Sequence, residues 1–311
     1  MFRHRISLVW IGTLALAVLA GACTPAPTPN PTAAPLSLTD GLERVVTLAG
    51  PAQRIVSLGP SNTEILFALG AGAQVAGRDD LSDFPAEAAS VPGVGATYGN
   101  FSVEAIVAVS PDLVLVSEIY TQEQVQSLAD AGLTVYWLAN PLTWDGLYAN
   151  LDTVGRLTGR EAEAQTVGAS LQARVQAVTR ALQGTAQRPT VFYELDATDP
   201  VKPYTVGTGT FVDLLITVAG GRNVGAALGT PYGQISSEEL VIQNPEVVVL
   251  GDSAYGVTVD SVAQRAGWSG IAAVRNGRVF VFDDNLASRP GPRLVDGLEA
   301  LAKLIHPELF K

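Results

Sequence analysis

The sequence predicts an α/β protein with two lobes, each built on a mostly parallel sheet. Three observations support this fold class. Apolar strand-like runs alternate with helical patterns, one helix–strand unit occurs twice, and a long stretch without strand signals separates two α/β blocks. The chain has 311 residues, of which 47% are hydrophobic, enough for two domains with their own cores.

The first α/β block begins near Arg54. "RIVSLGP" predicts a buried strand, "SNTEILFALGAG" a helix capped by Ser61 or Asn62 and stopped by a glycine, and "AQVAGR" the next strand. After the strand "DLVLVS" we expect a helix at "TQEQVQSLADAG" and a strand at "LTVYWL". These elements predict an N-terminal lobe of residues 44–141.

Residues 142–184 have no strand signal. The stretch divides at "LTGR" into two helices, and the second is long and closed by Gly184. A second block, residues 185–311, starts with the strand "PTVFYEL" and continues through helices at "GTFVDLLITVAGG" and "TVDSVAQRAGW". It ends with a strand at "GRVFVF" and a helix within "GPRLVDGLEALAKLIHP". We therefore expect two α/β lobes joined by an interlobe helical segment.

The repeated unit is "SVEAIVAVSPDLVLV", from Ser102, and "SSEELVIQNPEVVVL", from Ser236. In each copy a serine opens a short helix, a glutamate follows two residues later, and a proline stands seven residues beyond it. Glu104 and Glu238 thus occupy matching places. An acid in the first helical turn stabilises a helix by roughly 0.3–1 kcal/mol, but the duplication points to a shared role for the pair.

The N-terminus has the features of an export signal. Residues 1–22 combine "FRHR" with the apolar "ISLVWIGTLALAVLA", and Cys23 follows "LAGA", which resembles a bacterial lipoprotein box. Either Cys23 is lipidated after cleavage, or the segment is an ordinary secretory signal. The Pro-, Thr- and Ala-rich linker at residues 23–43 and the absence of a second cysteine favour lipidation. We expect an extracytoplasmic lipoprotein anchored to a membrane by its lipid alone.

Charge and histidine content exclude several functions. The chain has 19 Lys and Arg residues against 30 Asp and Glu residues, and the resulting net charge of −11 would repel nucleic acid. Only His4 and His306 are present, which argues against a histidine metal site and against Ser/His or Cys/His catalysis. "GTGTF" lacks the spacing of a dinucleotide fingerprint. We predict no metal, no cofactor and no catalytic residue, and hence no enzyme.

A family resemblance rests on landmarks in order: "RIVSLGPSNTEILFALGAG", "SDFP", the two repeat copies and "GPRLVDGLEALAKLI". Over residues 52–311 the chain resembles the substrate-binding proteins of ABC importers for vitamin B12, iron siderophores and haem. The resemblance implies two Rossmann-like lobes joined by a rigid helix, with the ligand in the cleft between them. It also implies a monomer that serves a permease dimer and its ATPase subunits. The cobalamin-binding branch is the most similar, so a corrinoid is the expected ligand.

The resemblance also implies site residues. Glu104 and Glu238 match the glutamates with which each lobe docks onto permease arginines. Arg293 is expected to cap or anchor the last helix.

The implied ligand contacts lie in loops at the cleft. Tyr98 and Tyr232 stand six residues before the two glutamates, where the cobalamin-binding branch has aromatic residues that flank the corrin. Each could instead pack on its own lobe. Arg289 and Asn285 could hydrogen-bond the corrin's amides, and Leu81 matches an aromatic ligand contact.

Other ligands and functions stay open from the sequence alone. Haem could use a tyrosine axial ligand, but "TYGNF" lacks the Tyr-x-Arg pattern of the haem-binding branch. An iron siderophore would need basic residues in the cleft, and only Arg78, Lys202 and Arg289 are candidates. A ligand-sensing receptor module or a lipoprotein enzyme would be a function of a different class.

Overall fold

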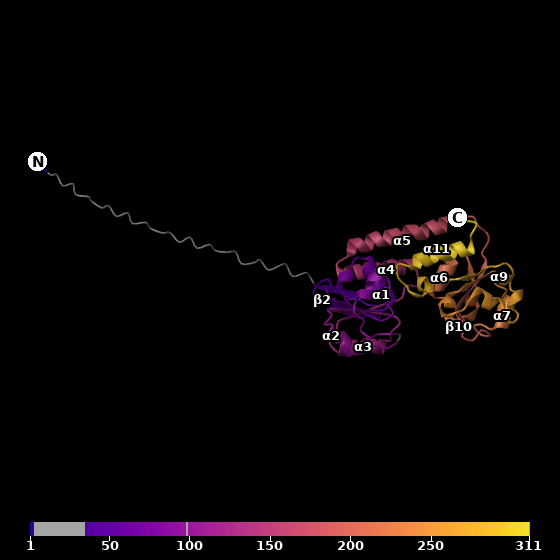
Figure 1. Cartoon of the computed structure of the whole chain (residues 1–311), viewed down its shortest axis with the longest axis horizontal. Coiled ribbons are helices and arrows are strands. Elements are labelled where there is room, and N and C mark those ends of the chain that lie inside the picture. Colours follow the sequence, from indigo (N-terminus) through magenta and orange to yellow (C-terminus); the bar gives the residue numbers. More distant parts are fainter. Residues whose placement is uncertain (3–34, 98, 311) are drawn as a thin grey trace. The chain divides into compact units, whose positions relative to one another are not determined.

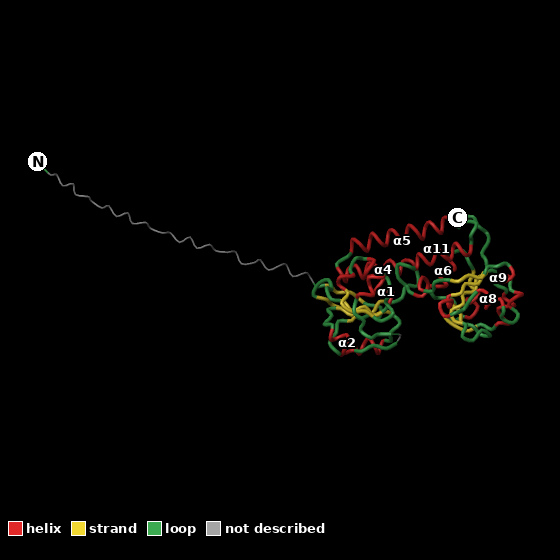
Figure 2. Tube along the Cα trace, in the orientation of Figure 1, coloured by secondary structure: helices red, strands yellow, loops and turns green. Residues whose placement is uncertain are grey.

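The computed structural model describes residues 1–2, 35–97 and 99–310. The described residues from 35 to 310 belong to one compact unit. Within it, a first sheet, two long helices and a second sheet follow one another along the chain (Figure 1). The strands gather in two separate groups (Figure 2), as the predicted two-lobed α/β fold requires.

The N-terminal lobe is built on a four-stranded, wholly parallel sheet in the order β4-β3-β5-β6. Its strands are β3 (Ile55–Leu58), β4 (Val75–Arg78), β5 (Leu113–Ser117) and β6 (Val135–Leu138). Every residue of β3 and β5 is buried, because helices cover both faces of the sheet. One face packs on α1 (Pro60–Ala68), and the other packs on α2 (Val103–Ala108) and α3 (Gln122–Asp130).

The C-terminal lobe has a six-stranded mixed sheet in the order β10-β8-β7-β11-β12, with β9 beside β7. Its strands are β7 (Thr190–Asp196), β8 (Tyr204–Val206), β9 (Arg222–Asn223), β10 (Tyr232–Gln234), β11 (Val247–Leu250) and β12 (Val279–Val281). Strands β8 and β10 run antiparallel to their neighbours, and the other pairs are parallel.

The helices of the second lobe also cover both faces of its sheet. They are α6 (Phe211–Val218), α7 (Ser237–Gln243), α8 (Val259–Ala263), α9 (Ala272–Arg275), α10 (Asn285–Ser288) and α11 (Leu294–Ile305). Helices α6 and α11 share one hydrophobic cluster with the sheet, and α7 and α8 belong to the cluster on the other face.

Two helices connect the lobes, as the sequence predicts. Helix α4 (Trp144–Thr158) ends at Gly159, which has a left-handed φ of 70°. Helix α5 (Glu161–Ala181) packs against α4 and α11. One buried apolar cluster runs from α1 and α4 of the N-terminal side to α6 and α11 of the C-terminal side. The lobes therefore share a continuous core on the side of α5.

The duplicated unit is confirmed in three dimensions. Ser102 caps α2 by accepting from the amide of Ala105 at 3.1 Å, and Ser236 caps α7 by accepting from Glu239 at 3.1 Å. Both units pass through a left-handed residue just before their proline, with φ of 52° at Ser110 and 48° at Asn244. The two sequence copies fold into the same helix–turn–strand motif.

Two boundaries differ from the sequence prediction. Helix α1 is not capped by Ser61 or Asn62; it starts at Pro60, whose fixed φ suits the first helical position, and Gly59 precedes it with φ 135°. A hairpin of β1 (Leu36–Thr39) and β2 (Val45–Leu48) begins inside the predicted linker of residues 23–43. The pairing of the two strands extends the folded part toward the N-terminus.

Candidate functional site: a cleft between the lobes

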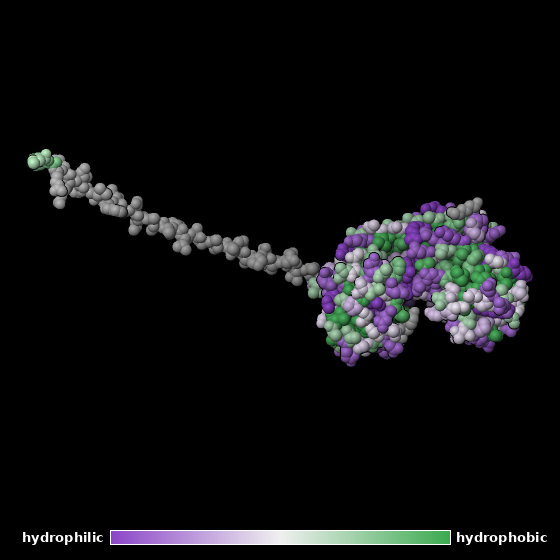
Figure 3. Space-filling model, in the orientation of Figure 1, coloured by the Kyte–Doolittle hydropathy of each residue, from purple (hydrophilic) through white to green (hydrophobic). Residues whose placement is uncertain are grey.

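A cavity of about 270 Å³ has walls from both lobes. It lies beyond the carboxyl ends of β3, β5, β6 and β7, where ligands of open α/β sheets are expected. The space-filling view is hollowed between the lobes (Figure 3). The lining residues are Pro60, Ser61, Ser117, Ile119, Asn140, Leu195, Val206, Phe211, Val212, Tyr232, Asp284, Ser288, Arg289 and Pro290.

On the N-terminal side, the walls come from residues that follow the strands. Pro60 and Ser61 open α1 directly after β3, and Ser117 ends β5. These two loops approach closely at Gly59, where an added Cβ would lie 2.2 Å from the Ser117 hydroxyl oxygen. The glycine therefore lets the chain turn and lets Ser117 reach the cleft.

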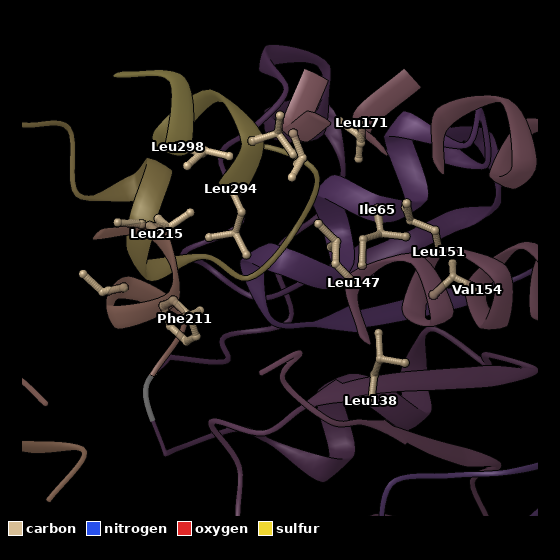
Figure 4. Packing of buried hydrophobic residues seen from close by; sticks show 14 of the residues in the cluster. Ile65, Leu138, Leu147, Leu151, Val154, Leu171, Phe211, Leu215, Leu294 and Leu298 are labelled. Carbon is tan, nitrogen blue, oxygen red and sulfur yellow. The ribbon is translucent and has the colours of Figure 1, made fainter. Parts of the chain in front are cut away.

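On the C-terminal side, apolar residues form much of the wall. Phe211 and Val212 open α6 and belong to the buried cluster that continues through Leu215 and Leu294. Figure 4 shows Phe211 and Leu215 on the same side of the cluster as Leu294 of α11. The apolar wall is thus fixed by the core behind it.

Tyr232 lines the cavity, as the sequence suggests. It is the first residue of β10 and pairs with Val206 of β8, and half of its surface is exposed. Burial raises the pKa of its phenol, and the carboxylates of Asp284 and Glu118 raise that pKa further. Glu118 belongs to the other lobe, so carboxylates on both sides of the cleft raise the pKa of the Tyr232 phenol.

Arg289 also lines the cavity, but its charge is already paired. Its guanidinium lies 2.5 Å from the carboxylate of Asp83 and 3.6 Å from that of Glu64. The hydrogen bond from Arg289 is the main cause of the lowered pKa of Asp83. A ligand that reaches Arg289 therefore meets an ion pair rather than an isolated positive charge.

A second arginine connects the segment before α11 to the N-terminal lobe. Arg293 donates two hydrogen bonds, of 3.0 and 2.5 Å, to the buried carboxylate of Glu64 on α1. Its guanidinium also lies over the ring of Phe84, 3.9 Å from the centroid. Arg293 was expected to cap or anchor the last helix; its side chain makes no cap on α11 (Leu294–Ile305), and it anchors the start of that helix to the other lobe instead.

Three further residues were predicted to contact the ligand, and none of them is found among the described walls of the interlobe cavity. Asn285 begins α10 and donates from its amide to Asp283 at 2.9 Å; it lines a neighbouring cavity instead of the interlobe one. Leu81 is half-buried and is not among the cavity's walls, and its N–H donates to Asp79. Tyr98 lies outside the described residues. Ligand contact by these three residues stays a prediction.

Glu104 and Glu238 are both exposed in the first turns of α2 and α7. Hydrogen bonds from the backbone and from the Ser102 hydroxyl lower the pKa of Glu104. Both carboxylates are therefore available to a partner, and their docking role stays a prediction. Cys23, the predicted lipidation site, lies outside the described residues.

Several wall residues were missed by sequence reasoning. Ser61, Ser117, Asn140 and Asp284 each stand at or just beyond the carboxyl end of a strand. The rule that ligands bind outside these strand ends would have selected them if applied strand by strand.

Positive charge is scarce in the cleft. Among the described wall residues Arg289 is the only cation; Arg78 and Lys202, the other two basic candidates, do not line the cavity. Arg78 instead donates to the backbone carbonyls of Ala88 and Asp79. Within the described ranges no group of three or more His, Cys, Asp or Glu is arranged to hold a metal ion. No helix within those ranges is both long and apolar enough to cross a membrane.

The fold and the cleft define a two-lobed ligand-binding protein. The family model described as periplasmic binding protein matches residues 55–286, and the chain belongs to this family. It is a substrate-binding protein of an ABC importer in the vitamin B12, haem and siderophore group, whose proteins are transport components rather than enzymes. Such proteins bind small molecules and work with a permease and an ATPase.

Three known proteins illustrate the similarity. The chain is 33% identical to the uncharacterized ABC transporter substrate-binding lipoprotein YvrC of Bacillus subtilis, over 97% of this chain and 98% of that protein. It is 32% identical to a cobalamin-binding protein of Halobacterium salinarum, over 98% of this chain and 86% of the relative. The solved structure of the periplasmic haem-binding protein RhuT from Roseiflexus sp. RS-1 has a TM-score of 0.74 at 28% identity, covering 83% of this chain and 99% of RhuT.

Proposed function

We propose that this protein captures a corrinoid between its lobes and delivers it to the permease of an ABC importer. The observation that carries the proposal is the interlobe cavity, whose walls combine apolar side chains with hydroxyl, amide and phenol groups. A corrinoid offers an apolar macrocycle with polar amide arms, which matches such walls. The relative named as a cobalamin-binding protein, similar over nearly the whole chain, supports the same ligand.

The charge of the cleft favours a corrinoid over an anionic ligand. Haem carries carboxylates, and many ferric siderophores are anionic. In this cleft the wall cation Arg289 is already paired with Asp83 and Glu64, and Asp284 adds a negative wall charge. An anion would have to displace these acids, whereas cyanocobalamin, which is neutral overall, would not.

Haem is the second candidate because one specific observation favours it. Tyr232 offers a half-exposed phenol to the cavity, and tyrosine can serve as an axial ligand of haem iron. The similarity to the haem-binding RhuT agrees with this alternative. Burial and the nearby acids raise the pKa of Tyr232, which disfavours the phenolate that iron would require.

The test compares how well the protein retains each of three coloured ligands. The purified protein is incubated with cyanocobalamin, haemin or a ferric siderophore, desalted, and its visible absorbance recorded. We expect cyanocobalamin to be retained in stoichiometric amount, with little haemin or siderophore. Retention of haemin in preference to cyanocobalamin would replace the proposed ligand by haem.

We further propose that a lipid on Cys23 holds the protein at the outer face of a membrane, as the name of the related lipoprotein YvrC suggests. A Cys23→Ala protein should therefore fractionate with the soluble extracytoplasmic proteins, whereas the parent should partition into detergent. Membrane retention of the variant would contradict lipid anchoring.

A further inference from the structure

A second cavity, of about 410 Å³, lies on the C-terminal side of the cleft. It shares Leu195 with the interlobe cavity. It also shares Tyr255 and Val257 with a third cavity of about 590 Å³, which in turn shares Asp284 with the interlobe cavity. The three spaces thus have wall residues in common and are adjacent to one another.

Asp252 is one of the wall residues of this second cavity, and one of its carboxylate oxygens has no hydrogen-bond partner. The residue follows β11, and only 3% of its surface is exposed. Its Oδ2 accepts a hydrogen bond from the amide of Ala197 at 2.9 Å, while Oδ1 has no partner. Five buried side-chain atoms lack a partner in the described part of the chain, and Asp252 supplies the only one that belongs to an ionisable group.

The neighbouring charges do not satisfy this oxygen. Arg265 is the nearby cation, and it donates from both terminal nitrogens to the carboxylate of Glu194. Its hydrogen bonds are therefore already used by a buried acid. Burial and the negative charge of Glu194 raise the pKa of Asp252 to about 6, so the carboxylate is mostly ionised at neutral pH. A buried anionic oxygen without a donor costs free energy unless another molecule supplies one.

We infer that Oδ1 of Asp252 accepts a hydrogen bond from an amide N–H of the captured ligand, and that the 410 Å³ cavity is a subsite for an amide-bearing arm. This inference rests on the proposed corrinoid function. A carboxylate only accepts, so the ligand must supply the donor. Corrinoids carry primary amides on arms around the macrocycle, which could reach past Leu195 while the ring occupies the interlobe cavity. A bond from an amide to a carboxylate is stronger than one between neutral groups.

The Asp252→Asn variant distinguishes a role in ligand binding from a role in folding. An Asp252→Asn side chain can still accept from Ala197 with its carbonyl oxygen, but it places an NH₂ group where the ligand's N–H would have to donate. It also removes a buried negative charge beside Glu194. Affinity should fall while the stability of the empty protein rises or stays the same, which a purely structural role would not produce.

The experiment measures the Kd of the full chain for two probes. One is cyanocobalamin, and the other is dicyanocobyrinic acid heptamethyl ester, whose arms end in esters that cannot donate. We expect Asp252→Asn to bind cyanocobalamin about 10- to 100-fold more weakly, but to bind the ester within about threefold of the parent. Asp260→Asn, at an exposed position on α8 away from the three cavities, is the matched control.

The outcomes are distinct. Equal affinity of Asp252→Asn and the parent for cyanocobalamin, or an equal loss for both probes, would overturn the subsite while leaving corrinoid capture intact. A parent that binds no cyanocobalamin would overturn the proposed function and this inference with it. If Asp252→Asn does not fold, Asp252→Ser, which removes the same carboxylate, is measured in the same way with the same criteria.

Discussion

Asp252 and Glu194 place two carboxylates near one another inside the C-terminal lobe, and only Glu194 has an arginine of its own. The pKa of Asp252 rises from its ordinary 3.8 to about 6, first through burial and then through Glu194, while hydrogen bonds from the backbone of Ala197 and of Asp252 itself, and then the charge of Arg265, oppose the rise. Between these two pH values the folded protein binds more protons at this site than the unfolded chain does. The contribution of Asp252 to stability is therefore fully present below the unfolded pKa and is lost as the pH rises through about 6.

The stability difference between Asp252→Asn and the parent should depend on pH. The variant cannot lose a proton at this position, so its stability relative to the parent should increase between about pH 4 and about pH 8. Denaturant unfolding of both proteins at several pH values measures the difference. A difference between Asp252→Asn and the parent that stays constant across this pH range would contradict the assigned titration.

Tyr232 is expected to act through contact with the ligand more than through folding, since half of its surface is exposed. Tyr232→Ala should weaken cyanocobalamin binding by about 1–3 kcal/mol and leave the melting temperature of the empty protein almost unchanged. Titration calorimetry checks the affinity, with Tyr204→Ala as a control of similar exposure outside the interlobe cavity. From the sequence, Tyr98→Ala should behave like Tyr232→Ala. Unaltered affinity in the double variant would remove the tyrosines from the site.

At the residue scale, the sequence predicts only part of the cleft. Tyr232 and Arg289 could be assigned because each stands in a segment whose place in the family pattern is recognisable. The pairing of Arg293 with Glu64 could not, because the partners are 229 positions apart and meet only when the lobes pack. The unpartnered oxygen of Asp252 was equally hidden, since it depends on which donors the fold leaves within reach.

At the scale of elements, the duplicated helix–strand unit was the most predictable feature. Its signals are local: a capping serine, an acid in the first turn, and a proline that cannot continue the helix. Strands β8 and β10 escaped prediction because each has only three residues and is held by antiparallel pairing with its neighbour. Such short strands depend on tertiary contacts more than on their own sequence.

The serine caps of α2 and α7 should each contribute to the stability of the protein. Ser102→Ala and Ser236→Ala should each lower the free energy of unfolding by about 1 kcal/mol, because each removes the side-chain acceptor from a helix start. Ser269→Ala, at an exposed position with no role in a cap, should change it by less than about 0.5 kcal/mol. Chemical denaturation measures all three. No loss in either cap variant would show that the hydrogen bond contributes nothing to stability.

At the scale of the whole molecule, the two lobes are held on one side and leave a ligand cavity between them. The continuous apolar cluster and the Glu64–Arg293 bonds join the N-terminal lobe to the segment around α11. The two copies of the capped helix place one exposed glutamate on each lobe. This arrangement suits a partner made of two related subunits, each of which would receive one carboxylate.

Ligand capture and ligand delivery should therefore be separable by substitution of the two exposed glutamates. Glu104→Arg, Glu238→Arg and the double variant are assayed for cyanocobalamin affinity and for uptake through the reconstituted permease and ATPase, on the same preparations. An interfacial charge deprived of its partner costs roughly 2–5 kcal/mol when buried and less at a rim. We predict unchanged affinity with loss of uptake, most severe in the double variant. Normal uptake by a double variant that binds and folds like the parent would contradict docking through these glutamates.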